Sequence, residues 1–307
     1  MPTHPIILAH GIARFDVLRE HFVQRLGLDN DSLTDHLHYF RNIHSHLSAS
    51  GFKPHHTRVR FAGSLEQRAQ DLKDQIEGYL SLSPGVSKVH IIAHSMGGLD
   101  ARYMITELGM QDRVCSLTTI GTPHWGSSFA DWGLEHRGED VLRRLDRVID
   151  LDGFLNLSSH NCREFNSERR EAAEADNEVF YQTYACWEEE RDRVFTPLQL
   201  SWEIIKRREE GENDGLVSVT SQRWTDRLRG ASGEKKVEQH DFPVFGDHFN
   251  EVGWWEAHQL SGKLGLRALL NPFNLVREVL EDRSAYEDAI KGTYLSIAED
   301  LQARYPA

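Results

Sequence analysis

A serine at position 95 stands in surroundings that could make it a nucleophile. Residues 89–94 form a largely apolar run, Ser95 follows, and Gly97 and Gly98 open a segment of helical character. A serine between a strand and a helix sits on a sharp turn that lifts its hydroxyl above the sheet. The strained turn needs small residues two positions away, and Ala93 and Gly97 provide them, although the first position is usually glycine. The pattern predicts Ser95 as a nucleophile, with a chance serine–glycine turn as the alternative.

A nucleophilic serine also needs a base and an acid that orients the base. In an elbow of this type the order along the chain is serine, acid, histidine. Asp214 and His248 follow Ser95 in that order, in predicted loops after late strands. Order and spacing alone do not select them, because the chain has 17 histidines. The competitors for the two roles are His240, His258, Asp192, Asp226 and Asp247.

Two backbone N–H groups are needed to hold the oxyanion that forms when an ester carbonyl is attacked. We expect one from Met96, which follows the nucleophile at the positive end of a helix. The other should come from the turn after the first strand, at His10 and Gly11. Gly11 lets the backbone bend so that the Ile12 amide points into the site. The alternative for this turn is an ordinary end of a strand.

Alternating strand and helix signals must position these residues. A capping box of Ser64 and Gln67 marks one helix start. Repeated strand–helix–strand units predict an α/β fold with a mostly parallel central sheet and helices on both faces. The predicted strands cover residues 5–9, 57–61, 88–93, 114–120 and 181–186. The predicted helices cover residues 35–49, 64–80, 97–108, 201–210 and the tail from 254.

The alternation stops after residue 126, and the composition changes. Residues 131–193 carry 17 acidic and 9 basic side chains. We predict one domain over 1–307, with a cap or lid inserted at about 127–200. Its apolar residues recur at helical spacing, which fits either a surface helix or a lid over an acyl-binding cleft. The candidate pocket or lid residues are Trp125, Val148, Ile149, Phe154 and Leu155.

The whole chain is acidic, with 35 Lys and Arg against 48 Asp and Glu and a net charge of -13. This balance argues against nucleic acid and anionic membranes as partners. The sequence has no apolar run long enough for a transmembrane helix and no signal-peptide pattern at its start. Three cysteines do not suggest a disulfide framework, and Cys115 has the pattern of a core residue. We therefore expect a cytoplasmic protein, with secretion only if a leader precedes this sequence.

Four segments together resemble the bacterial triacylglycerol lipases of the pseudomonad and Proteus type. They are residues 5–16, the turn at 93–102, residues 213–217 and residues 247–252. Residues 93–102 and 116–130 also resemble the related fungal intracellular lipases. The similarity covers most of the catalytic domain and is thin in the cap and tail. It implies an α/β-hydrolase fold and assigns the site as nucleophile Ser95, acid Asp214, base His248 and oxyanion amides of Ile12 and Met96.

The sequence departs from the pseudomonad-type lipases at two structural features. Those enzymes hold a Ca²⁺ near the catalytic histidine with an aspartate and a glutamine, which are Asn250 and Trp254 here. Ca²⁺ prefers several charged or carbonyl oxygens, so these changes argue against the site. We expect no cofactor, with a structural Ca²⁺ as the alternative that the resemblance implies. They also have a disulfide, for which Cys186 matches the first cysteine but Thr220 occupies the second position. That bond cannot form here, which agrees with a reducing compartment.

These features predict ester hydrolysis through an acyl-enzyme on Ser95. Neutral acylglycerols are the expected substrates, with transient contact at a lipid interface. The alternatives are a soluble short- or medium-chain carboxylesterase, a phospholipase, a thioesterase or an amidase with the same three residues. A hydrolase fold kept as a binding protein is a further alternative. His124, next to Trp125, is expected to be a turn residue, because the triad already has its histidine.

Overall fold

The computed structural model describes residues 4–12, 38–60, 63–136, 151–255, 259 and 272–306. Six parallel strands of this part form the central sheet, in the order β2-β1-β3-β4-β5-β8. Their bounds are β1 (Ile6–Ala9), β2 (Pro54–His56), β3 (Val89–His94), β4 (Val114–Ile120), β5 (Phe180–Ala185) and β8 (Glu238–Asp241). The predicted parallel α/β architecture is confirmed.

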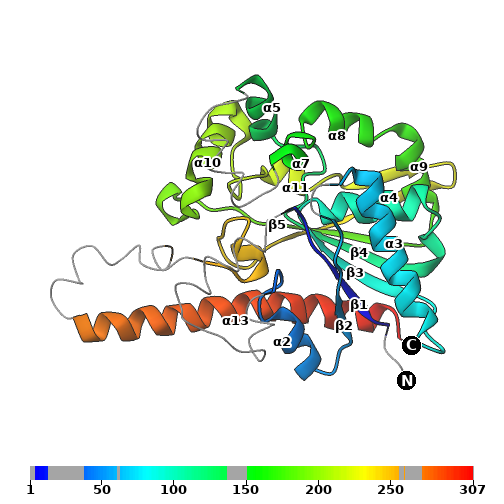
Figure 1. The fold of residues 1–307 in the computed structure, drawn as a ribbon, viewed down its shortest axis with the longest axis horizontal. Helices are drawn as coiled ribbons and strands as arrows, with labels where there is room; N and C mark the ends of the chain where they lie inside the picture. The colour runs from blue at the N-terminus through cyan, green and yellow to red at the C-terminus, as the bar shows by residue number, and fades with distance from the viewer. Residues whose placement is uncertain are drawn as a thin grey trace.

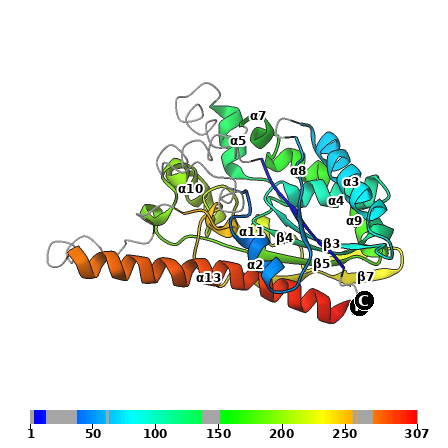
Figure 2. The same cartoon turned by 60° about the horizontal axis from the view of Figure 1, so that its bottom comes forward.

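Helices cover both faces of the sheet (Figures 1 and 2). On one face lie α2 (Ile43–Ala49) and the long α13 (Pro272–Arg304), and on the other lie α3 (Leu65–Ser81), α4 (Gly97–Glu107) and α9 (Glu168–Asp176). Each face buries its own apolar cluster, as a fully covered parallel sheet requires. The remaining named helices are α5 (Ser128–Glu135), α7 (Leu151–Leu155), α8 (Ser159–Phe165), α10 (Gln199–Ile205) and α11 (Val219–Gln222).

The central strands bring the candidate loops to one edge of the sheet. Strands β1, β3 and β4 are buried along their whole length, as expected for a parallel sheet that is covered on both faces. Ala9 of β1 pairs with Ala93 of β3, so the two strands end at nearly the same level. The turn after β1 and the turn after β3 therefore start side by side. This register places the predicted oxyanion loop next to the predicted nucleophile.

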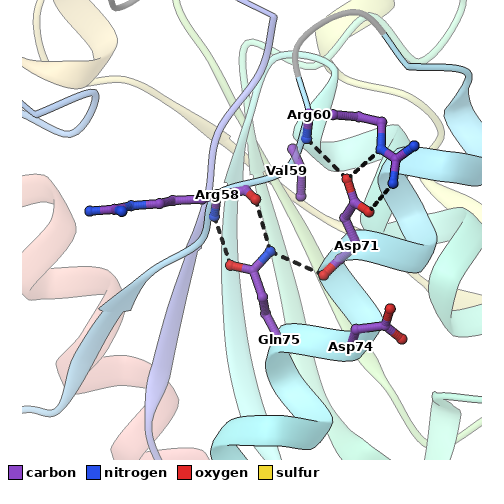
Figure 3. Close-up of a pocket in the computed structure, with 6 residues that line it drawn as sticks. All are labelled: Arg58, Val59, Arg60, Asp71, Asp74 and Gln75. Carbon is purple, nitrogen blue, oxygen red and sulfur yellow. Dashed lines mark hydrogen bonds and ion pairs between the residues drawn. The ribbon is translucent and has the colours of Figure 1, made fainter.

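One predicted strand is shorter and lies earlier than expected. The spacing predicts a strand over 57–61, but β2 covers Pro54–His56, and residue 61 lies outside the described residues. Side chains of α3 bind the next amides instead of a strand: Arg58 N–H donates to Gln75 Oε1 at 2.8 Å, and Arg60 N–H donates to Asp71 Oδ2 at 3.0 Å. The residues that make these bonds line an open hollow of about 530 Å³ between this segment and α3 (Figure 3). Arg58 and Arg60 are thus fastened to α3, whereas the Thr57 N–H still donates to the Leu8 carbonyl of β1 at 3.2 Å.

Other predicted element boundaries shift for local reasons. The predicted helix over 35–49 is described only from 38 onward and begins at Ile43, because Asn42 has a left-handed backbone (φ 60°). The capping box of Ser64 and Gln67 is confirmed at the start of α3. The helix predicted over 201–210 begins at 199 and ends as a π-helix, η5 (Lys206–Glu210). In the tail, the described helix begins at 272 rather than 254.

The predicted cap region contributes both helices and a strand of the sheet. In the sequence, β4 and β5 are separated by helices α5, α7, α8 and α9. In the sheet, β5 pairs directly with β4. Val148 and Ile149 lie outside the described residues, and the limits of the cap stay a prediction. All three cysteines are free and buried, in agreement with the expected lack of a disulfide. The described helices include none long and apolar enough to span a membrane.

Candidate active site

Ser95 lies on the turn between β3 and α4, and its backbone has the left-handed conformation with φ 58°. This conformation is uncommon for a residue with a side chain and marks a strained turn. Ser95 N–H donates to the Ile120 carbonyl at 2.9 Å, which fastens the turn to β4. A Cβ added at Gly97 would lie 2.7 Å from the Ala9 carbonyl oxygen. The small residue is therefore needed because the end of β1 approaches the turn closely.

The loop after β1 packs directly on the candidate nucleophile. A Cβ added at Gly11 would lie 2.6 Å from Ser95 Cβ and 3.0 Å from Ser95 Oγ. Ile12 and Met96 are both buried and belong to one apolar cluster. Within the described part of the chain, neither the Ile12 N–H nor the Met96 N–H donates a hydrogen bond. Buried amides are nearly always paired, so two unpaired N–H groups beside Ser95 suit an incoming oxygen.

The structure brings Asp214 and His248 together. His248 Nδ1 lies 2.8 Å from Asp214 Oδ2, and the His248 N–H donates to the Asp214 carbonyl at 2.9 Å. The other oxygen, Asp214 Oδ1, accepts the N–H of Leu216 at 2.8 Å and of Val217 at 2.7 Å. These bonds fix the Asp214 carboxylate where it can accept the Nδ1–H of His248. His248 Nε2 is then free to accept a proton.

His248 also lies close to the nucleophile turn. Its ring centroid is 4.5 Å from that of His94, the residue before Ser95. No hydrogen bond joins Ser95 and His248 among the described residues. Such bonds are often long before substrate binds, and they shorten in the substrate complex. The predicted acid and base thus form a pair that lies next to His94, the residue before the predicted nucleophile.

Sequence reasoning missed a buried chain of hydrogen bonds behind the site. The Gly11 N–H donates to Tyr39 Oη at 3.1 Å, and the same Tyr39 oxygen is hydrogen-bonded to His94 Nδ1 at 2.7 Å. His94 Nε2 is in turn hydrogen-bonded to Glu251 Oε2 at 2.8 Å. Glu251 Oε2 also lies 3.8 Å from His248 Nδ1. The chain links the oxyanion loop to the loop of the candidate base.

Burial shifts the pKa values of the ionisable groups in this hydrogen-bond chain. Burial and the nearby His248 hold the pKa of His94 well below its usual range. Burial, with the carboxylate of Asp214 close by, raises the pKa of Glu251 well above its usual range. Both shifts favour neutral groups, which is how buried polar side chains avoid an uncompensated charge. Glu251 is three residues after His248, but no spacing rule points to Tyr39.

Only one described group of side chains has the spacing of metal ligands. Nitrogen and oxygen atoms of His94, His248 and Glu251 lie within 4.8 Å of one another. His94 and Glu251 already bind each other, and His248 Nδ1 faces Asp214. A metal ion here would have to break those bonds. We therefore describe the group as part of the hydrogen-bond network.

The residues next to the candidate base do not fit a calcium ion. The Asp247 carboxylate accepts N–H bonds from Phe195 (2.6 Å), Phe249 (2.9 Å), Asn250 (3.0 Å) and the Gln259 side chain (2.6 Å). The Asn250 side-chain NH₂ donates to the Trp254 carbonyl at 2.8 Å. A calcium ion needs six to eight oxygen ligands, and N–H donors occupy this carboxylate instead.

The other residues singled out from the sequence take different positions. Trp125 is 38% exposed, and its indole N–H donates to the Trp224 carbonyl at 2.6 Å. Phe154 is buried in the same cluster as Ile12 and Met96, and Leu155 is also buried. His124 is buried, stacks on Trp224 and lies in the turn after β4. An acyl pocket at Trp125, Phe154 and Leu155 stays a prediction.

The competitors for the acid and base roles lie in positions that suit catalysis less well than those of Asp214 and His248. The competitors Asp192 and Asp226 are exposed. His240 lies on β8 and stacks on Tyr184, and His258 is outside the described residues. His10 lies in the turn after β1: its Nε2 accepts the Val59 N–H at 3.2 Å, and its Nδ1–H donates to the Gly11 carbonyl at 2.8 Å.

Comparisons with known proteins find lipases among the proteins that this chain resembles. Residues 19–152 match the model of the PGAP1-like alpha/beta domain family. Triacylglycerol lipase 2 of Saccharomyces cerevisiae is 28% identical over 292 residues, which is 82% of this chain and 81% of that protein. A triacylglycerol lipase of Vibrio cholerae is 34% identical over 128 residues, or 42% of this chain and 35% of that protein.

A solved structure shares the fold. Lipase 1 from Pelosinus fermentans is 19% identical and superposes with a TM-score of 0.56, covering 82% of this chain and 94% of that chain. At this identity the likeness concerns the fold alone.

Proposed function

We propose that this chain, an α/β-hydrolase related to the triacylglycerol lipases, hydrolyses carboxylic esters of neutral acylglycerols through an acyl-enzyme on Ser95. The observation that carries the proposal is the Asp214–His248 pair, 2.8 Å apart, beside a serine with positive φ. A strained serine, an oriented histidine and two unpaired amides are the parts that acyl transfer needs.

In the proposed reaction, His248 takes the proton from Ser95 as the hydroxyl attacks the ester carbonyl. Asp214 holds the ring in the right tautomer and stabilises the imidazolium that forms. The amides of Ile12 and Met96 donate to the oxyanion. His248 then gives its proton to the leaving alcohol, and water attacks the acyl-enzyme in the same way to release the acid.

Exposed apolar side chains on the cap support an apolar substrate. Leu134 on α5 and Leu200 on α10 are exposed, and the two helices pack against each other. These exposed leucines on two contacting helices support transient contact with a lipid surface. The net charge of -13 favours an uncharged interface over an anionic one. Three free thiols support a reducing compartment, so we also propose a cytoplasmic location.

The test is hydrolysis of p-nitrophenyl esters by the wild type and by Ser95→Ala. We expect the variant to lose nearly all activity and all labelling by a fluorophosphonate probe, while its melting temperature is retained. A Ser95→Ala variant as active as the wild type would exclude the acyl-enzyme on Ser95. A series of acyl chain lengths, with a rate increase above the solubility limit of the ester, separates a lipase from a soluble esterase.

A further inference from the structure

Arg68 is a buried cation for which the proposed reaction gives no role. It lies in the second turn of α3, and its side chain is fully buried. A buried guanidinium needs acceptors for its five N–H groups, so its partners show what it holds in place. Those partners come from both halves of the predicted oxyanion hole.

The guanidinium binds the carbonyl groups of the loop after β1. Arg68 Nη2 donates to the His10 carbonyl at 3.2 Å and, at the long limit of 3.4 Å, to the Gly11 carbonyl. Arg68 Nη1 donates to the Arg60 carbonyl at 2.7 Å. Arg60 belongs to the segment fastened to α3 through Asp71, shown in Figure 3. Arg68 therefore touches both peptide groups that lead to Ile12.

These contacts fix the direction of the Ile12 amide. The described peptide bonds are all trans, so a carbonyl and the N–H of the next residue point in opposite directions. The Gly11 carbonyl faces Arg68 and also accepts the His10 Nδ1–H at 2.8 Å, and this placement turns the Ile12 N–H away from α3. The Gly11 N–H is already taken by Tyr39, at 3.1 Å. Of these amides, the Ile12 N–H is the one left to bind a ligand.

Asp100 fixes the guanidinium in turn. Arg68 Nη2 lies 2.7 Å from Asp100 Oδ2, and Arg68 Nε lies 3.0 Å from the same oxygen. Asp100 is in the first turn of α4, four residues after Met96, and its side chain is buried. Such a forked, charge-assisted pair sets orientation as well as distance. It connects the loop that carries the Ile12 amide to the helix that follows the Met96 amide.

We propose that Arg68 is a positioning residue for the oxyanion hole, and that its Asp100-braced guanidinium sets the relative orientation of the Ile12 and Met96 amides. The inference rests on the proposed function. The chain offers a matched buried pair: Arg102, on α4 like Asp100, lies 2.7 Å from Glu174 of α9. In the described chain, the side chain of Arg102 binds residues of the cap and of the turn after β4, not the loop of Ile12.

The test compares Arg68→Lys with Arg102→Lys. Lysine keeps the charge but not the planar fork that reaches a carboxylate and two carbonyls together. We expect kcat of Arg68→Lys to fall about 10- to 100-fold with KM nearly unchanged, because the oxyanion forms only in the transition state. The Ki of a boronic acid, which forms a tetrahedral adduct, should rise by the same factor. Arg102→Lys should lose stability but keep kcat and Ki.

A second pair of variants covers the case in which Arg68→Lys does not fold. Asp100→Asn keeps the volume and removes the brace, and Glu174→Gln makes the same change in the other pair. A fall in kcat for Asp100→Asn alone supports the proposal. The proposal would be overturned if Arg68→Lys matched Arg102→Lys in kcat and Asp100→Asn matched Glu174→Gln, or if only KM rose. Either result would leave ester hydrolysis intact. An inactive wild type or a fully active Ser95→Ala would overturn the proposed function and this inference with it.

Discussion

Ser95 is held by residues close to the ends of two neighbouring strands, whereas His248 is held by side chains from several distant segments. We call residues 9–12 with 93–98 the nucleophile side, and Asp214 with residues 247–251 the base side. On the nucleophile side, the distances are set by backbone atoms and missing side chains, as at Gly11 and Gly97. On the base side, they are set by buried hydrogen bonds to carboxylates.

The difference decides how each side fails when it is changed. A small residue acts by leaving room, so replacing it causes a steric conflict at short range. A buried carboxylate acts by accepting N–H groups, so replacing it leaves donors without partners. Substitutions on the nucleophile side should therefore displace the site, and those on the base side should change its charge and its stability.

The largest effect is expected on the base side, from Asp214→Asn. An amide cannot stabilise the imidazolium, and it favours the wrong tautomer of His248, so kcat should fall about 10⁴-fold. The measurement is kcat on a p-nitrophenyl ester, with the melting temperature as a check of folding. Asp226→Asn is the control, because Asp226 is exposed and should leave kcat unchanged. An active Asp214→Asn would move the acid role to Glu251 or Asp247.

On the nucleophile side, Gly11→Ala should lower kcat about 10²- to 10³-fold, as the loss of one oxyanion donor does. The new Cβ would lie 2.6 Å from Ser95 Cβ, so the loop or the serine has to move. Gly78→Ala is the control, since a Cβ there meets nothing within 4 Å and its helix should gain stability. Steady-state kinetics on both variants decide the matter: equal kcat values would contradict the close packing of loop and serine.

The same contrast explains what the sequence could predict. The nucleophile turn, the capping box of α3 and the order of acid and base depend on local residue types, and the structure brings Asp214 and His248 together as expected. The roles of Tyr39, Arg68 and Glu251 depend on contacts between distant segments, which no spacing rule encodes. The predicted strand was wrong over the described residues 57–60, where side chains of α3 bind the amides of Arg58 and Arg60.

Lowering the pH should change the folding stability of the protein in opposite directions through the two sides. Burial, with Arg68 nearby, lowers the pKa of His10 to about 4, so between pH 6.5 and 4 the unfolded chain binds a proton that the folded chain does not. Folding stability should then fall by about 2 kcal/mol between pH 7 and pH 5 on account of His10. Urea unfolding of the wild type and His10→Gln at both pH values measures this, and the variant should show the smaller loss.

Asp247 on the base side provides the opposite sign. Burial raises its pKa to about 6, although N–H bonds from Phe195 and Asn250 oppose the shift. The folded chain therefore binds a proton before the unfolded chain does, and stability should rise by about 1 kcal/mol between pH 7 and pH 5. Asp247→Asn should remove this gain. Equal pH dependence in His10→Gln, Asp247→Asn and the wild type would show that neither group titrates as described.

The smallest effect, close to none, is expected from removing divalent ions. The Asp247 carboxylate already accepts four N–H groups, and Asn250 presents its NH₂ to the Trp254 carbonyl, so the loop of His248 is closed by hydrogen bonds. Millimolar EDTA or calcium should shift the melting temperature by less than about 1 °C. Asp247→Asn should instead lower stability by about 1–3 kcal/mol, because buried donors lose their acceptor. A large loss of melting temperature in EDTA, restored by calcium, would mean that the base side is held by an ion after all.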